Sequence, residues 1–225
     1  MESKKIKEKF RAKWATWALL ESGAQLASKF FQKIIGVASA SLSHVLFATT
    51  MCGFVQMMVG LFIIKVRRRK LLTKRIYIIG ACLFGFFGAI GSFLIYYIFF
   101  LGGEVGASTF ITTLFIIPGA LADRFIFGHK LKLHQWLGII IGLFAGYLIL
   151  DSPSLSEVLN LPLWIWLSFL ITITRVINQI ITKSIKDIDP FVKNFWGGGV
   201  QFLLPIIPLY FLNSLDILQN PRGSM

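Results

Sequence analysis

The apolar residues of this chain fall into seven long runs, which short clusters of glycine, proline and charged residues separate. The runs cover about residues 14–34, 43–64, 76–100, 107–127, 133–150, 162–182 and 191–212. Because a helix rises about 1.5 Å per residue, roughly 20 apolar residues are enough to cross the apolar core of a bilayer. The pattern therefore predicts an all-α, polytopic membrane protein with about seven transmembrane helices.

Composition agrees with this prediction. Of the 225 residues, 56% are hydrophobic and 15% are charged, and 22 are phenylalanine. This composition is far from that of soluble globular domains and disfavours that class. The two cysteines, Cys52 and Cys82, lie inside apolar runs without the spacing of a metal site. We expect them to be buried thiols, and we expect no metal and no cofactor.

The basic residues alternate between the connections. Nineteen of the 23 Lys and Arg stand before the first run or around the turns that follow the second, fourth and sixth runs. The connection after the third run carries Glu104, and the connection after the fifth carries Asp151 and Glu157, with no Lys or Arg in either. The connection after the first run is ambiguous, because Lys29 and Lys33 approach it. The positive-inside rule then predicts a multi-pass protein of the plasma or inner membrane with a cytoplasmic N-terminus. The net charge of +13 thus indicates topology and anionic-lipid contact, and no nucleic-acid partner is expected.

Two of the predicted helices carry a polar stripe. The stripe of the first run is Glu21, Gln25, Lys29 and Gln32, and that of the sixth is Arg175, Asn178, Gln179 and Thr182. Each stripe must face protein or a wet cavity, since polar groups facing lipid are costly. Glu21 and Arg175 would each lie about 10 Å from the cytoplasmic surface and could meet. The pair is either a static ion pair or a functional group such as a gate, a proton site or an anion contact.

Three other runs have features that affect packing. The fourth contains hydroxyl side chains and Pro118, which frees a backbone carbonyl that neighbours or water must satisfy. The seventh contains three successive glycines before Pro205 and Pro208, so we expect a kinked or locally open helix there. The hydroxyls either line a cavity or bond to carbonyls of their own helix. The fifth run has a ridge of three glycines, Gly138, Gly142 and Gly146. This ridge predicts close helix packing, either within the chain or in a homodimer.

A short internal similarity links the second and seventh runs. Gly53-Phe54-Val55-Gln56 matches Gly198-Gly199-Val200-Gln201 at three of four positions. In both segments a glutamine, Gln56 or Gln201, falls near the membrane interior. The two runs would cross the membrane in opposite directions, as in the inverted repeats of transporters. A match this short is also what coincidence produces, so both interpretations stay open.

The stretch from Glu104 to Asp151 resembles the end of an EamA-type half of the drug/metabolite transporter superfamily. The similar features are a helix with a central Pro118, a turn from Gly128 to Leu131 and the glycine-spaced fifth helix. His129 stands where the family usually has an acidic residue, so no role of that acid is transferred. The resemblance implies a first five-helix repeat over residues 1–150 and, over 151–225, the first two helices of an inverted second repeat.

The first helix also resembles that of the small multidrug resistance branch of the same superfamily. Leu20-Glu21 is followed, eight residues after the glutamate, by Lys29-Phe30. In that branch the membrane glutamate binds protons and cationic drugs in competition, which implies a coupling role for Glu21. The family normally has ten helices with a cavity between two halves, so the chain looks truncated.

These observations favour a transporter that moves a small organic solute by alternating access, with proton coupling as a further hypothesis. The expected substrate-binding or coupling residues are Glu21, Gln25, Arg175, Asn178 and Gln179, followed by Gln56 and Gln201. A non-transporting membrane scaffold or partner subunit is the alternative. A membrane-embedded enzyme is less favoured, because the sequence has no metal-ligand cluster, serine nucleophile motif or phosphate-binding loop.

Overall fold

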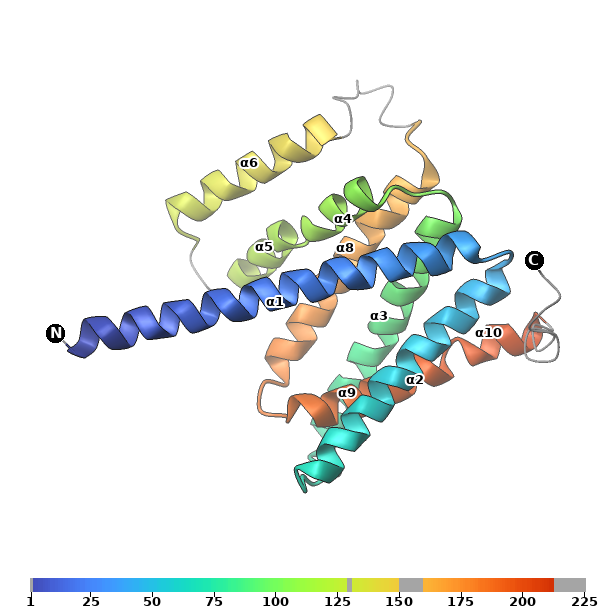
Figure 1. Ribbon diagram of the computed structural model, residues 1–225, viewed down its shortest axis with the longest axis horizontal. Coiled ribbons are helices and arrows are strands. Elements are labelled where there is room, and N and C mark those ends of the chain that lie inside the picture. The colour runs from blue at the N-terminus through green and yellow to red at the C-terminus, as the bar shows by residue number, and fades with distance from the viewer. Residues whose placement is uncertain (1, 129–130, 150–159, 213–225) are drawn as a thin grey trace.

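The computed structural model describes residues 2–128, 131–149 and 160–212. In the first helix, the described side chains are Thr16, Leu19, Leu20 and those from Gly23 onward. The described residues form only helices and no strand (Figure 1). The helices are α1 (Glu2–Ala38), α2 (Leu42–Val66), α3 (Arg75–Phe100), α4 (Val105–Thr113), α5 (Ile116–Phe127), α6 (Leu133–Ile149), α8 (Leu163–Ser184), α9 (Pro190–Leu203) and α10 (Ile206–Phe211).

Four helical segments in the described part are long and apolar enough to cross a membrane. They are α2, α3, the pair α4 and α5 taken together, and α8. Large apolar side chains on them face outward; Phe62 of α2, for example, is 68% exposed. An outer surface of this kind suits lipid rather than water. The prediction of an all-helical, multi-pass membrane protein is therefore confirmed at this level.

The structure does not show the count of seven spans, because the other three runs form different helices. Helix α6 has 17 residues, and the seventh run is divided into α9 with 14 residues and α10 with 6. The division falls at Pro205, which lacks a backbone N–H and cannot continue the ladder of hydrogen bonds. Helix α1 is long, at 37 residues, but much more polar than the others.

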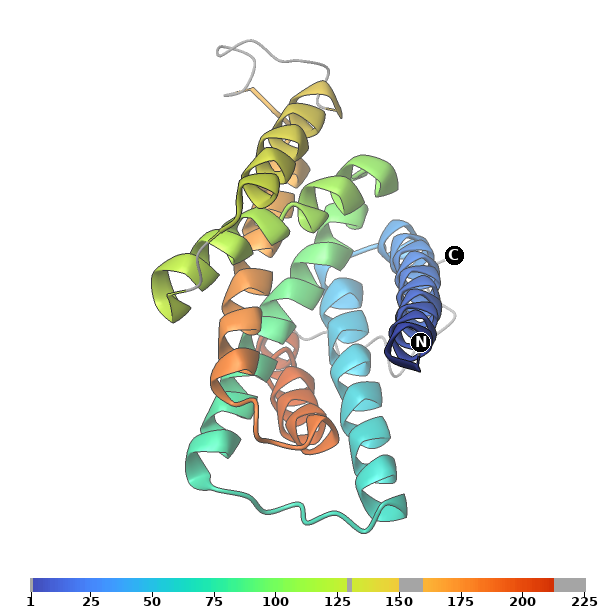
Figure 2. The ribbon, with the colours of Figure 1, turned by 90° about the vertical axis from the view of Figure 1, so that its left-hand side faces the viewer.

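The core lies among α2, α3, α8 and α9, because the most extensive helix contacts are those of α2 with α9, α3 with α8 and α3 with α9. Figures 1 and 2 show α1 crossing one side of this group while α6 lies outside α4 and α5. One buried cluster joins α2, α3 and α8 through Val45, Leu94, Ile95, Tyr96, Ile98, Phe99 and Ile171. A second cluster, near the connections after α2 and α8, consists of Ile64, Ala81, Ile185, Ile188 and Val192.

Helices α2 and α9 cross backbone to backbone, and the crossing involves the two similar segments of the sequence. A Cβ atom on Gly53 would lie 2.4 Å from the backbone N of Phe202, which follows Gln201. A Cβ atom on Gly198 would lie 2.5 Å from the backbone N of Met57. Each glycine therefore faces the backbone beside the glutamine of the other segment. The two segments meet reciprocally, as they would about an approximate two-fold axis.

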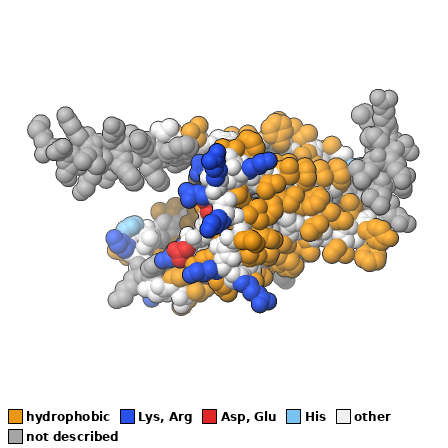
Figure 3. Space-filling model, turned by 90° about the horizontal axis from the view of Figure 1, so that it is seen from below, with side chains coloured by type: hydrophobic (Ala, Val, Ile, Leu, Met, Phe, Trp, Pro, Cys, Tyr) orange, Lys and Arg blue, Asp and Glu red, His pale blue; other side chains and the backbone are white. Residues whose placement is uncertain are grey.

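The basic connections after α2 and after α8 lie at the same end of the molecule. Arg69 forms an ion pair with Asp189, with 3.8 Å between Nε and Oδ2. The guanidinium of Arg67 lies 5.0 Å from the ring centre of Phe191. Figure 3 shows Lys and Arg gathered on this part of the surface beside a broad apolar face. Two of the basic connections thus form one basic end of the described part of the chain.

Candidate functional site

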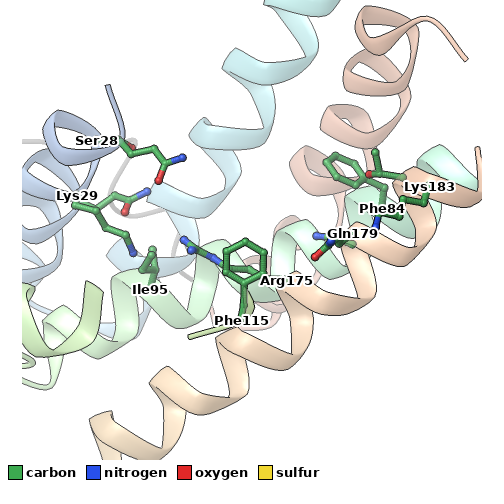
Figure 4. A pocket seen from close by; sticks show the side chains of 12 residues that line it. Ser28, Lys29, Phe84, Ile95, Phe115, Arg175, Gln179 and Lys183 are labelled. Atoms are coloured by element: carbon green, nitrogen blue, oxygen red, sulfur yellow. The ribbon is translucent and has the colours of Figure 1, made fainter. Parts of the chain in front are cut away.

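A polar cavity of about 730 Å³ lies between the two helices that carry the predicted stripes (Figure 4). Helices α1 and α8 supply most of its wall, while α3 and the link between α4 and α5 close it with aromatic and aliphatic side chains. The lining residues are Gln25, Ser28, Lys29, Gln32, Phe84, Ile95, Phe115, Arg175, Asn178, Gln179, Thr182 and Lys183. Four of the predicted site residues are thereby brought together: Gln25, Arg175, Asn178 and Gln179.

Helix α1 contributes its polar stripe because it is held against α3 beyond the cavity. A Cβ atom on Gly36 would lie 2.5 Å from the Cβ of Phe99, so the two helices touch there. Helical spacing then directs Gln25, Lys29 and Gln32 to one side. Lys29 is only 7% exposed, and its Nζ has no hydrogen-bond partner among the described residues. The side chain of Glu21 lies outside the described residues, so its pairing with Arg175 stays a prediction.

Arg175 is positioned by the break between α4 and α5. Helix α4 ends at Thr113, so the carbonyl groups of its last turn lack a full set of partners within the helix. Arg175 donates a hydrogen bond from Nη1 to the carbonyl oxygen of Thr112, at 3.4 Å. Its guanidinium also lies 5.7 Å from the ring centre of Phe115, a cation–π contact. The helix break in the fourth run therefore fixes a charged group at the cavity.

Beyond Arg175, α8 presents two amides of its stripe to the cavity, and Lys183 follows the stripe. The side-chain oxygens of Asn178 and Gln179 are buried without a hydrogen-bond donor in the described part of the chain. Gly119 of α5 leaves room for Gln179, since a Cβ there would come within 2.8 Å of Oε1. At the end of α8, Lys183 forms an ion pair with Asp123 of α5. Among the described residues, hydrogen-bonding capacity therefore remains unused at the two amides, while the charge of Lys183 at the end of α8 is paired.

The two glutamines of the second group lie apart from this cavity. Gln201 donates from Nε2 to the Oγ of Ser92, at 2.8 Å. Ser92 lines a smaller cavity of about 180 Å³, which Arg175 and Asn178 also line. Gln201 thus supports the wall of a neighbouring space. Gln56 lies at the α2 and α9 crossing and lines neither cavity.

The structure also places the remaining predicted packing features. Gly142 and Gly146 of α6 face side chains of α4 and α5, whereas a Cβ on Gly138 would meet nothing within 4 Å. In the fourth run, Thr113 donates to the carbonyl of Thr109 in its own helix. The described part of the chain contains no group of three or more metal-ligating side chains.

Several lining residues were not among the predicted site residues. Lys29, Gln32 and Thr182 belong to the predicted stripes, so helical spacing was the signal that could have included them. Phe115 and Lys183 carried no comparable signal, because their positions depend on contacts between distant helices.

The described side chains give the cavity a basic lining. Lys29, Arg175 and Lys183 line it, and none of its described lining residues is acidic. Figure 4 shows Lys29 and Arg175 extending toward one another across the space. Its chemistry is that of a polar site with several amides and with two cations, Lys29 and Arg175, that form no ion pair with a described residue, inside helices with an apolar exterior.

Sequence and structure comparisons add no relative to this picture. No protein-family model matches the chain, and no curated protein or solved structure matches it. Membership of the drug/metabolite transporter superfamily accordingly stays a prediction that rests on the resemblance of the sequence motifs.

Proposed function

We propose that this chain is a carrier of the drug/metabolite transporter type that moves a small organic solute across the plasma or inner membrane by alternating access. The observation that supports this proposal best is the polar cavity between α1 and α8. Its volume of about 730 Å³ is within the range of small-molecule sites. Polar and charged groups at membrane depth are energetically costly, so their presence there favours a role such as solute binding.

The direction in which the cavity is accessible follows from the charges. The lining runs along α8 from Arg175 to Lys183, which is close to the basic end of the molecule. By the positive-inside rule we assign this end, and the N-terminus, to the cytoplasm. The described conformation then corresponds to a cavity that is reached from the cytoplasmic side. In this assignment α1, α6 and the α9–α10 pair complete the seven spans.

The alternating motion requires segments that bend. The break between α4 and α5 and the break between α9 and α10 are suitable, because a helix lacks continuous backbone hydrogen bonds at each. The first break contacts Arg175 directly through Thr112 and Phe115. Solute binding at Arg175 would therefore act on a helix break, which gives a physical link between occupancy and motion.

The proposal is tested by transport in liposomes that contain the whole purified chain. Labelled organic acids, polyols, amino acids and quaternary amines are supplied outside, and uptake is compared with empty liposomes. Ser28→Trp would fill the cavity and is expected to abolish uptake. Leu26→Trp is the matched control, since Leu26 is on the same helix but 67% exposed and outside the cavity. Equal uptake by the two variants would contradict the proposal, and a stable partner protein without any transport would favour a scaffold.

A further inference from the structure

The cavity contains a charge imbalance that the described protein groups do not resolve. Lys29 is buried, with 7% of its surface exposed, and its Nζ makes no hydrogen bond to any described group. Arg175 lies opposite Lys29 across the same space (Figure 4). An ammonium group without a partner in a buried site is costly, and a second cation nearby increases that cost.

We propose that the cavity binds a small organic oxyanion, with its carboxylate or phosphate group between Lys29 and Arg175 and its hydroxyl groups toward the amides. The inference rests on the proposed function, because it takes this cavity to be the path of the solute. It specifies the chemical class of the solute, which the transport proposal leaves open.

The anionic group is indicated by the two cations. A guanidinium has five N–H donors, of which one bonds to the carbonyl of Thr112, so others can bond to a carboxylate or phosphate. An oxyanion between the two groups would supply the missing partner of Lys29 and would screen the repulsion between the cations. Lys183 is less suited to this role, since Asp123 already neutralises it.

The hydroxyl groups are indicated by unused acceptors. The side-chain oxygens of Gln32, Asn178 and Gln179 are buried and lack donors in the described ranges. All three side chains line the same cavity as the two cations. A buried acceptor without a donor is unfavourable, and a solute with hydroxyl groups would satisfy several acceptors at once.

The test compares gluconate with sorbitol, which have similar size and hydroxyl content but differ in charge. Binding to the whole purified chain in detergent is measured by the shift of its thermal unfolding temperature and by titration at constant ionic strength. Glycerol 3-phosphate, choline and inorganic phosphate are measured in parallel. We expect gluconate or glycerol 3-phosphate to stabilise the protein and sorbitol and choline to leave it unchanged. The first two probes distinguish a carboxylate from a phosphate ester.

Variants locate the bound anion. Lys29→Gln should weaken anion binding by at least ~10-fold, as expected for loss of a charge-assisted hydrogen bond. Lys33→Gln is the matched control, because Lys33 is on the same helix but does not line the cavity. Lys29→Arg keeps the charge and should retain binding, which provides a second measurement if the glutamine variant does not fold.

Three results would overturn the inference. They are equal binding of sorbitol and gluconate, preferential binding of choline, and unchanged gluconate affinity in Lys29→Gln. Inorganic phosphate that binds as tightly as both organic anions would also overturn it, since the amides would then have no role. Uptake of choline without anion binding would contradict this inference alone. Binding of gluconate without uptake of any solute would contradict the transport proposal alone.

Discussion

Helices α2 and α9 touch backbone to backbone, whereas α1 and α8 face each other across a cavity. The first contact is made by glycines, with Gly53 and Gly198 each against the main chain of the other helix. The second is made by long polar side chains, with Lys29 and Arg175 on opposite walls. Small residues allow close approach of helices in a membrane, and long polar residues prevent it. Close packing and the proposed solute binding therefore belong to different helix pairs.

The largest effect is expected from a side chain at the close crossing. Gly198→Leu would place a Cβ 2.5 Å from the backbone N of Met57, and the backbone cannot yield as a flexible side chain can. We expect destabilisation of about 3 kcal/mol or more and little folded protein. Gly106→Leu is the control, since its Cβ would meet nothing within 4 Å. Yield and unfolding temperature in detergent provide the measurement, and equal values for the two variants would remove the distinction between the helix pairs.

Much of the arrangement at the cavity follows from local spacing. The intervals between Gln25 and Lys29, and between Arg175 and Gln179, are single helical turns, so each stripe and its direction can be predicted from the sequence. The same holds for the all-helical, membrane-spanning class and for the alternation of basic connections.

Other features depend on contacts between distant residues, which local patterns do not contain. The ion pair of Lys183 with Asp123 joins residues 60 positions apart in the sequence, and the hydrogen bond from Arg175 to Thr112 joins residues 63 positions apart. The similarity around Gly53 and Gly198 was visible, yet its meaning as a reciprocal contact required the three-dimensional arrangement. Pro118 indicates a freed carbonyl and Pro205 a kinked helix, but neither predicts that the fourth and seventh runs each divide into two helices.

The second prediction concerns the coupling role that the sequence predicts for Glu21 of α1. Glu21→Gln removes a negative charge but keeps the size of the side chain, so the protein should still insert and fold. If Glu21 carries the coupled proton, the proton-driven component of uptake into liposomes should disappear. Uptake with and without an imposed pH gradient is the measurement, and Glu104→Gln, in the exposed connection before α4, is the control. Unchanged gradient-driven uptake would exclude the coupling role.

The third prediction separates stability from binding at one residue. Lys29→Met removes an ammonium that is buried without a partner among the described groups and replaces it with an apolar side chain of similar length. In the absence of solute we expect the variant to be more stable by about 1–2 kcal/mol, because the buried charge is removed. Lys33→Met should change stability less, since Lys33 is only partly buried. Thermal unfolding without added anions checks the sign, and destabilisation by Lys29→Met would show that Lys29 is satisfied within the protein.

The smallest effect is expected at the end of α8, where the cavity reaches the basic end of the molecule. Asp123→Asn breaks the ion pair with Lys183. The side chain of Asp123 is 23% exposed and that of Lys183 is 38% exposed. Ion pairs near solvent contribute about 0–1 kcal/mol, so the unfolding temperature should fall slightly or not at all. The substitution also releases a third cation at the cavity, and anion affinity should then rise modestly, most clearly at low salt. An unfolding temperature that falls as far as in Gly198→Leu would mean that the contact of α5 with α8 contributes as much to stability as the crossing of α2 with α9, and would remove the distinction between the two regions.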